Sequence, residues 1–315
     1  MTAAFKTSDS KVLSGIADQP LHAQAQSPAR GILLLVASTI VFSLCDVITK
    51  HLAATLPAVE VAWLRYVTFA FIVVPWVMVS GGRTLFRAKR PGLQVLRSFG
   101  IIGSTLFFTQ GLRYLPVAES TAIYFISPIL IMALSILFLG ETVGWRRWTA
   151  ALVGLVGVLI VIRPGTDAFQ LTALLPLLGA TSWAAGAVVT RKMSGSEHPL
   201  TTLVYSAIMG CLVLSLLLPF NWVTPTGSEV GLAALMGVFF AAGQWLVVLA
   251  YRHGNASVIA PFSYVQLLWA GALGYLVFGA LPDGWTILGA GIIAASGLYT
   301  AYRERVRMLQ ARRGA

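Results

Sequence analysis

Residues 30–54 read RGILLLVASTIVFSLCDVITKHLAA, an apolar run in which Asp46 is the single acidic residue. A bilayer core about 30 Å thick needs about 20 residues of helix, so a run of this length predicts a membrane-spanning helix. Ten such runs follow one another along the chain, at residues 30–54, 58–80, 94–112, 117–139, 147–163, 170–192, 198–219, 230–251, 256–279 and 285–303. They are continuous and lack the alternation of barrel strands. We therefore expect an all-α integral membrane protein with ten transmembrane helices.

The composition excludes a water-soluble globule. Hydrophobic residues make up 57% of the 315 residues and charged residues only 10%, whereas soluble proteins contain about 25% charged residues. The two cysteines, Cys45 and Cys211, both lie within apolar runs. This placement excludes a disulfide framework and a thiolate metal site.

The net charge of +11 follows the positive-inside pattern of membrane proteins. With a cytoplasmic N-terminus, most of the 22 Lys and Arg residues fall on the inner side. Only Lys50, Arg113 and Arg163 fall outside, and Arg65 lies within a span. We expect both termini to be cytoplasmic. Anionic lipid head groups are then the natural partners of the excess charge, and no nucleic acid is implied.

The two halves of the chain match each other at a nearly constant shift. The matched pairs are Phe42 with Trp183, Lys50 with Arg191, Ala118 with Ala256, Gly140 with Gly279, Trp145 with Trp285, and Gly157 with Gly297. Each half contains five spans, an odd number, so the second copy must enter the membrane from the opposite side. We expect inverted five-helix repeats at 30–163 and 170–303, a linker at 164–169, a disordered cytoplasmic tail at 1–29 and a basic cytoplasmic tail at 304–315.

Two sets of motif residues recur in these halves. The first set is Leu115-Pro116-Val117-Ala118, Pro128, Leu139-Gly140-Glu141-Thr142, Gly154, Gly157 and Arg163-Pro164-Gly165; the second is Ala250-Tyr251-Arg252, Ala256-Ser257, Ala260-Pro261-Phe262-Ser263-Tyr264 and Phe278-Gly279. Both sets resemble the EamA-type domain of the drug/metabolite transporter superfamily, over about residues 30–303. One position departs from the pattern, because Ala280 stands where Glu141 predicts an acidic residue. The resemblance implies a ten-helix exporter, similar to bacterial exporters of amino acids and related metabolites, including aromatic amino-acid exporters of the YddG type.

Asp46 and Arg65 lie within predicted spans, where charge is rare and indicates function. Counted back from the turn near residues 55 and 56, they fall at equal depth on neighbouring helices, about 13 to 15 Å from the turn at about 1.5 Å per residue. Lys50 and Glu60 would form a second rung nearer the surface. These four residues are candidates for an ion-paired outer gate. Two alternatives stay open: the pair only fixes the hairpin, or Arg65 docks a substrate carboxylate.

A small amphipathic solute needs mostly apolar and aromatic walls with a few oriented polar groups. Midspan side chains that could supply them are Thr39, Phe107, Tyr124, Trp183, Tyr205, Gln244, Ser263 and Gln266. Packing or a hydrogen bond within the same helix is the alternative for each of them. Pro128 and Pro261 each remove a helix hydrogen bond, one in each half, and are candidate hinges or static kinks that shape a cavity.

These features predict a secondary transporter that exports amino acids or related small metabolites across the bacterial inner membrane by alternating access around a midplane cavity. The same fold could exchange a sugar phosphate or nucleotide sugar, but only Arg65 offers a cation to the cavity. An intramembrane lipid-modifying enzyme would need clustered acids, bases or metal ligands, and Asp46 is the sole midspan carboxylate. We find no motif for a metal, ATP or another cofactor. Protons are a candidate coupling ion.

Overall fold

The computed structural model describes residues 28–81, 86–140, 145–163, 170–193, 196–220, 222–253 and 260–313. All regular structure in these ranges is helical. The elements are α2 (Pro28–Thr55), α3 (Ala58–Gly81), α4 (Pro91–Tyr114), α5 (Val117–Tyr124), α6 (Ser127–Leu139), α7 (Trp145–Ile162), η2 (Leu171–Ala173), α8 (Leu174–Met193), α9 (Pro199–Leu217), η3 (Leu218–Phe220), α10 (Gly227–His253), η4 (Ala260–Val265), α12 (Gln266–Phe278) and α13 (Gly284–Arg313). Residues 1–27 of the predicted tail, the predicted linker 164–169 and Glu141 lie outside the described residues.

Six segments of the described chain are long and apolar enough to cross a membrane: Ala29–Thr55, Ala58–Val79, Val117–Leu139, Leu171–Met193, Leu200–Phe220 and Gly227–Ala250. Three apolar helices are shorter, namely Trp148–Ile162, Phe262–Phe278 and Gly284–Tyr299. Helix α4 has 24 residues but belongs to neither group, because Gln94, Arg97 and Gln110 reduce its hydropathy. These lengths and compositions indicate a multi-pass membrane protein, and the number of ten spans stays a prediction.

The last helix is longer than the predicted span. Helix α13 continues to Arg313, so residues 304–313 of the predicted basic tail extend this helix. The segment consists mainly of Arg, Glu, Met, Leu, Gln and Ala, which favour helix, and contains neither glycine nor proline.

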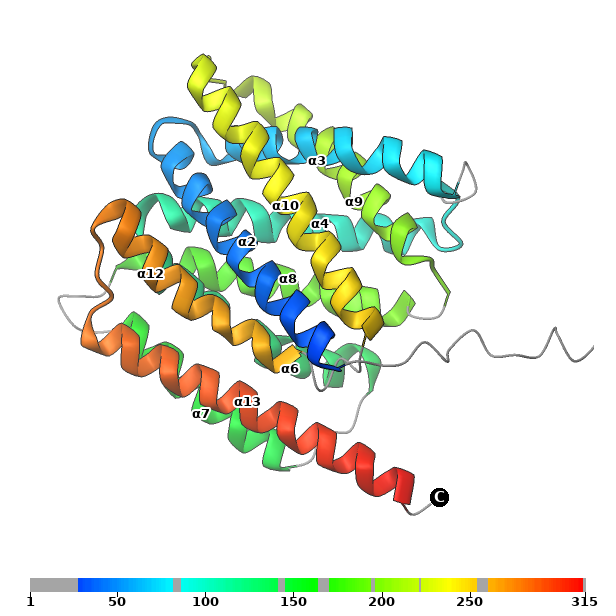
Figure 1. The fold of residues 1–315 in the computed structure, drawn as a ribbon, viewed down its shortest axis with the longest axis vertical. Coiled ribbons are helices and arrows are strands. Elements are labelled where there is room, and N and C mark those ends of the chain that lie inside the picture. Colours follow the sequence, from blue (N-terminus) through cyan, green and yellow to red (C-terminus); the bar gives the residue numbers. More distant parts are fainter. Residues whose placement is uncertain are drawn as a thin grey trace, which may run out of the picture.

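The helices form two crossed layers (Figure 1). In the front layer α2 packs between α10 and α12, and in the rear layer α8 packs between α4 and α6. Helices α3 and α9 pair at one end of the molecule, and α7 and α13 pair at the other end. Each layer therefore takes its central helix from one half of the chain and both flanking helices from the other half.

Two predicted spans, one in each half, depart from regular α-helix near the middle, and we call these places helix breaks. Helix α5 ends at Tyr124 and α6 starts at Ser127, while in the second half the 3₁₀ helix η4 precedes α12. Pro128 lies in the first turn of α6, where the missing N–H of proline costs no helical hydrogen bond. Pro261 lies within η4. Both prolines thus mark helix breaks, and their movement as hinges stays a prediction.

The two broken spans end in the same way. Gly140 caps α6 and Gly279 caps α12, with φ angles of 67° and 65°. Only glycine adopts this left-handed conformation readily, because a Cβ atom there costs about 1–2 kcal/mol. The requirement explains why glycine follows the last apolar residue of the motif in both halves.

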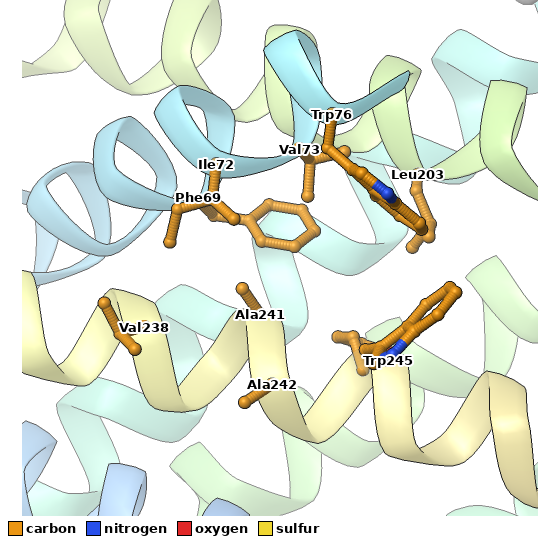
Figure 2. A pocket seen from close by; sticks show the side chains of 10 residues that line it. Phe69, Ile72, Val73, Trp76, Leu203, Val238, Ala241, Ala242 and Trp245 are labelled. Atoms are coloured by element: carbon orange, nitrogen blue, oxygen red, sulfur yellow. The ribbon is translucent and has the colours of Figure 1, made fainter. Parts of the chain in front are cut away.

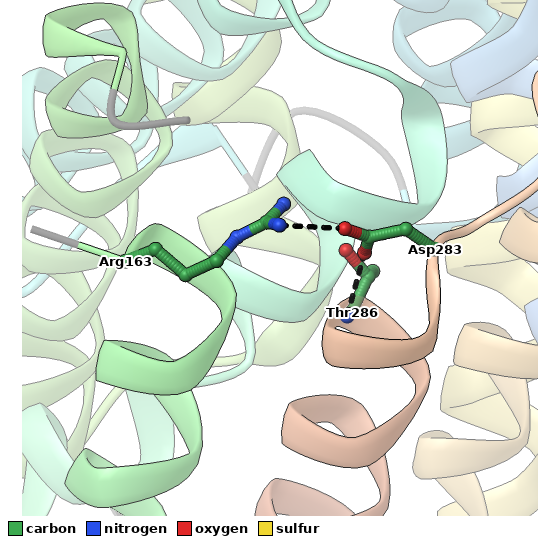
Figure 3. Close-up of polar contacts among 3 residues, drawn as sticks. All are labelled: Arg163, Asp283 and Thr286. Atoms are coloured by element: carbon green, nitrogen blue, oxygen red, sulfur yellow. Dashed lines mark hydrogen bonds and ion pairs between the residues drawn. The ribbon is translucent and has the colours of Figure 1, made fainter. Parts of the chain in front are cut away.

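Helices α7 and α13 approach closely and are joined by an ion pair (Figure 3). A Cβ atom on Gly157 would lie 2.9 Å from the carbonyl oxygen of Gly289, so the backbones nearly touch. Arg163 Nη1 lies 2.7 Å from Asp283 Oδ2. Asp283 also caps α13 by accepting a 2.8 Å hydrogen bond from the backbone N–H of Thr286. Partial burial alone would raise the pKa of Asp283, but the bonds from Thr286 and the charge of Arg163 lower it.

Candidate functional site

Asp46 and Gln266 connect the two halves of the chain within the front layer. Gln266, the first residue of α12, donates a 3.2 Å hydrogen bond from Nε2 to Oδ2 of Asp46 in α2, across 220 positions of sequence. Asp46 is only 9% exposed. A buried carboxylate is costly unless it is hydrogen-bonded or paired. The bond therefore places a hydrogen-bonded carboxyl group beside the helix break of the second half.

Arg65 of α3 supplies the opposite charge. Its side chain is 6% exposed, and its Nε atom is buried without a hydrogen-bond partner among the described residues. The guanidinium lies over the ring of Phe240 in α10, 5.2 Å from the ring centroid. The charge of Arg65 interacts with Asp46 without a direct contact. No described carboxylate oxygen lies within 4.0 Å of its guanidinium nitrogens, the limit for an ion pair. We call Asp46, Arg65 and Gln266 the charged cluster.

Lys50 and Glu60 bind other groups in this structure. Lys50 Nζ donates to the carbonyl oxygens of Leu112 and Leu115, at 2.8 and 2.7 Å, and so satisfies the end of α4. Glu60 Oε2 accepts a 3.0 Å hydrogen bond from the backbone N–H of Val223. Among these described side chains, neither ion pair of the predicted gate is formed, that is, neither Asp46 with Arg65 nor Lys50 with Glu60.

The two helix breaks contact each other across the halves. Phe125, in the first break, packs against Tyr264 of η4 with ring centroids 5.1 Å apart. Tyr124 shares a 2.9 Å hydrogen bond with Ser104 of α4, and its ring centroid lies 4.9 Å from that of Phe108. Discontinuous helices border the solute sites of many transporters. The predicted solute residue Tyr124 therefore lies beside a break, as Gln266 does in the other half.

Other predicted solute residues have a range of environments. Thr39 is buried and donates a 2.7 Å hydrogen bond to the carbonyl oxygen of Val36, within its own helix. Phe107 is exposed, whereas the next residue, Phe108, packs against Tyr124. Three others are half-buried: Trp183 in α8, Tyr205 in α9 and Ser263 in η4.

Arg97 is a functional candidate that the charge pattern concealed. By sequence it belongs to the inner-side cations, although the predicted span 94–112 contains it. Its Nε atom donates a 2.8 Å hydrogen bond to Thr190 of α8, and Nη1 donates to Ser206 of α9. Arg97 therefore joins a first-half helix to two second-half helices. Its position inside a span was the signal that distinguishes it from a loop cation.

A cavity of about 380 Å³ lies between α3, α9 and α10 (Figure 2). Its walls are aliphatic and aromatic apart from the amide of Gln244, a predicted solute residue. No member of the charged cluster lines it. Phe69, which does line it, packs against Phe240 with ring centroids 5.0 Å apart, and Phe240 in turn carries Arg65. An aromatic wall thus separates the cavity from the charged cluster.

In the part of the chain that the structure describes, no three His, Cys, Asp or Glu side chains are grouped so that they could hold a metal ion.

Known proteins resemble the chain over nearly its whole membrane part. An S-adenosylmethionine uptake transporter from Rickettsia felis is 30% identical over 278 residues, which cover 88% of this chain and 94% of the relative. A riboflavin transporter from Vibrio cholerae is 31% identical over 280 residues, covering 85% and 92%. The pseudopaline exporter CntI from Pseudomonas aeruginosa is 28% identical over 268 residues, covering 84% and 94%.

The fold is shared with a solved structure as well. A crystal structure with 18% sequence identity superposes with a TM-score of 0.61, over 89% of this chain and 99% of the other. The model of the EamA-like transporter family matches twice, at residues 29–163 and 170–302, once in each half. With its helical membrane architecture, its paired motifs and these matches, the chain belongs to the EamA-like transporter family.

Proposed function

We propose that the chain is a secondary transporter that exports amino acids or related small metabolites across the bacterial inner membrane by alternating access. The relatives move different molecules, S-adenosylmethionine, riboflavin and pseudopaline, and they include both uptake transporters and an exporter. They support a small-molecule solute. Its chemical class is inferred from the charged cluster.

The charged cluster carries the proposal because its two opposite charges are buried and not paired with each other. Arg65 has no described carboxylate within 4.0 Å, and Asp46 accepts a hydrogen bond from the neutral amide of Gln266. Buried charge is costly until it finds a partner. The carboxylate of an amino acid suits the planar fork of Arg65, and its ammonium group suits Asp46. A zwitterion would therefore satisfy both residues at once.

The layer arrangement supports alternating access. Exchanging the two halves converts the front layer, α10–α2–α12, into the set of helices that forms the rear layer, α4–α8–α6. Two inverted repeats that exchange conformations turn an inward-facing cavity into an outward-facing one. Ten spans, cytoplasmic termini and inverted repeats are parts of this proposal. Protons are the proposed coupling ion, because a proton can neutralise a buried carboxylate such as Asp46.

Transport in proteoliposomes tests the proposal. The purified chain is assayed against a panel of amino acids, loaded inside or outside the vesicles, with and without a proton gradient. We expect Arg65→Gln to weaken the apparent affinity for zwitterions about 10- to 100-fold, the range for a lost hydrogen bond to a charged group. Arg65→Lys should lose less. Arg113→Gln, at an exposed position of α4, is the matched control.

Two results would reject parts of this proposal. Unchanged affinity in Arg65→Gln would remove Arg65 from the solute site. Transport of a neutral ring compound such as riboflavin, with no transport of any amino acid, would reject the zwitterion as the solute class.

A further inference from the structure

The cavity between α3, α9 and α10 is a slot that lies between two contacts of α3 with α10. At one end Thr68 and Gly237 touch, since a Cβ atom on Gly237 would lie 2.3 Å from the side chain of Thr68. At the other end the indole rings of Trp76 and Trp245 meet edge to face, with centroids 4.6 Å apart. Figure 2 shows side chains of α3 and α10 facing each other across the slot, with Trp76 and Trp245 at one end. The slot therefore results from the way α3 and α10 pack against each other.

The side of the slot is open to an apolar surface. Ile72 of α3 and Val238 of α10 both line it, and both are exposed, at 38% and 46%. Close by on α3, Phe71 is 77% exposed and Val79 is 89% exposed. In a membrane protein such a surface faces acyl chains. A hydrocarbon chain can thus enter the slot sideways from the bilayer.

Polarity rises along the slot toward one end. Away from the tryptophans it is lined by Val73, Val238 and Ala241, which carry no polar side-chain atoms. The tryptophan end adds two indole N–H donors, and Gln244, which precedes Trp245 in the chain, also lines the slot. Tryptophan is enriched at the membrane–water interface, which is the depth at which the ester groups of phospholipids lie.

Cationic residues follow Trp76 along the chain. Helix α3 ends at Gly81, and Phe86, in the connection to α4, packs on the same hydrophobic core as Trp76. The next cationic residues, Arg87 and Lys89, are exposed. Along the chain, the apolar part of the slot is thus followed by hydrogen-bond donors and then by cations. A phospholipid has matching parts in the same order: an acyl chain, an ester group and a phosphate.

We propose that the slot between α3, α9 and α10 binds a phospholipid with an anionic head group, its acyl chain lying between Ile72 and Val238 and its phosphate held by Arg87 and Lys89. An acyl chain gains little by moving from one apolar environment to another. Selectivity therefore comes from the cations, which contribute about fivefold each in affinity for an anionic lipid surface. The proposal is independent of the solute that the protein transports.

Fluorescence quenching by brominated lipids tests this site. The purified full chain in detergent is titrated with phosphatidylglycerol or phosphatidylcholine that carries brominated acyl chains. The chain has nine tryptophans, so the signal of the slot is the quenching lost in the double variant Trp76→Phe and Trp245→Phe. We expect this signal to saturate at lower concentrations of phosphatidylglycerol than of phosphatidylcholine.

Variants at the two ends of the lipid separate its parts. Arg87→Gln with Lys89→Gln should weaken phosphatidylglycerol binding about 25-fold and leave phosphatidylcholine binding unchanged. Ala241→Phe fills the slot and should abolish saturable quenching. Leu276→Phe, on the exposed surface of α12, is the matched control and should change nothing.

Three results would overturn the proposal. The first is equal binding of both lipids, and the second is quenching that survives Ala241→Phe. The third is displacement of the brominated lipid by a water-soluble solute that the protein transports, because this would make the slot part of the solute path. If Ala241→Phe does not fold, the two charge-neutralising substitutions, which lie at exposed positions, decide the question.

Discussion

Replacing Gln266 with leucine removes the hydrogen bond that joins the two halves at Asp46 and keeps a side chain of similar size. The bond is 3.2 Å long, and its acceptor is 9% exposed. A hydrogen bond to a charged group contributes about 1.5–3 kcal/mol. Since about 1.4 kcal/mol corresponds to a factor of ten, we expect Gln266→Leu to change solute affinity or the balance of conformations about 10- to 100-fold.

A double-mutant cycle measures this contribution. Apparent solute affinity in proteoliposomes is compared among wild type, Gln266→Leu, Asp46→Asn and the double variant. If the two side chains bind each other, each single substitution removes the same interaction, and the coupling energy should be about 1.5–3 kcal/mol. Gln170→Leu replaces an exposed amide and serves as the control. The amount of inserted protein is measured for every variant, so that lost folding is not taken for lost transport.

Additive effects would refute the reasoning. A coupling energy below about 0.5 kcal/mol is the behaviour of independent sites. It would mean that Gln266 and Asp46 act separately, and that the bond does not link the halves during transport.

Further predictions concern stability and topology. Gly140→Ala should lower the free energy of unfolding by about 1–2 kcal/mol, because its left-handed φ angle is strained for alanine although no atom lies within 4 Å; Gly227→Ala, which also has open space, should cost much less in the same denaturation assay. The pKa of Asp283 is lowered below its ordinary value of 3.8, so its stabilising contribution is complete well above that pH and is lost as the pH falls through the lowered pKa; Asp283→Asn should lower the unfolding temperature at pH 7 and have a smaller effect at pH 3. Cysteines placed near Lys89 and near Thr226 should react with an impermeant thiol reagent from opposite sides of the membrane, and labelling from one side would contradict the ten-span topology.

The spans could be read from the sequence because membrane length and helical backbone bonding leave few options. The predicted run 30–54 became α2, Pro28–Thr55, and 58–80 became α3, Ala58–Gly81. Gly140 and Gly279 were also visible as a matched pair, and the structure shows the local requirement behind the match, a left-handed residue at the end of each helix.

The sequence did not show which face of each helix packs against the neighbouring helices. A membrane helix that is apolar all round gives no hydrophobic face to orient it. The sequence did not show that Phe108, next to the predicted Phe107, packs against Tyr124, or that Ser206, next to the predicted Tyr205, accepts a hydrogen bond from Arg97. Solute contact by Phe107 and Tyr205 stays a prediction.

Local sequence determined the helices, their approximate lengths, the motif of the family and the presence of buried charge at Asp46 and Arg65, because each depends on residues close together in the chain. Only the tertiary structure decided the partners of those charges. Asp46 binds Gln266 in place of Arg65, and Arg65 stacks on Phe240. Such contacts depend on how helices from opposite halves pack against each other, and a separation of 220 positions leaves no local signal of that packing.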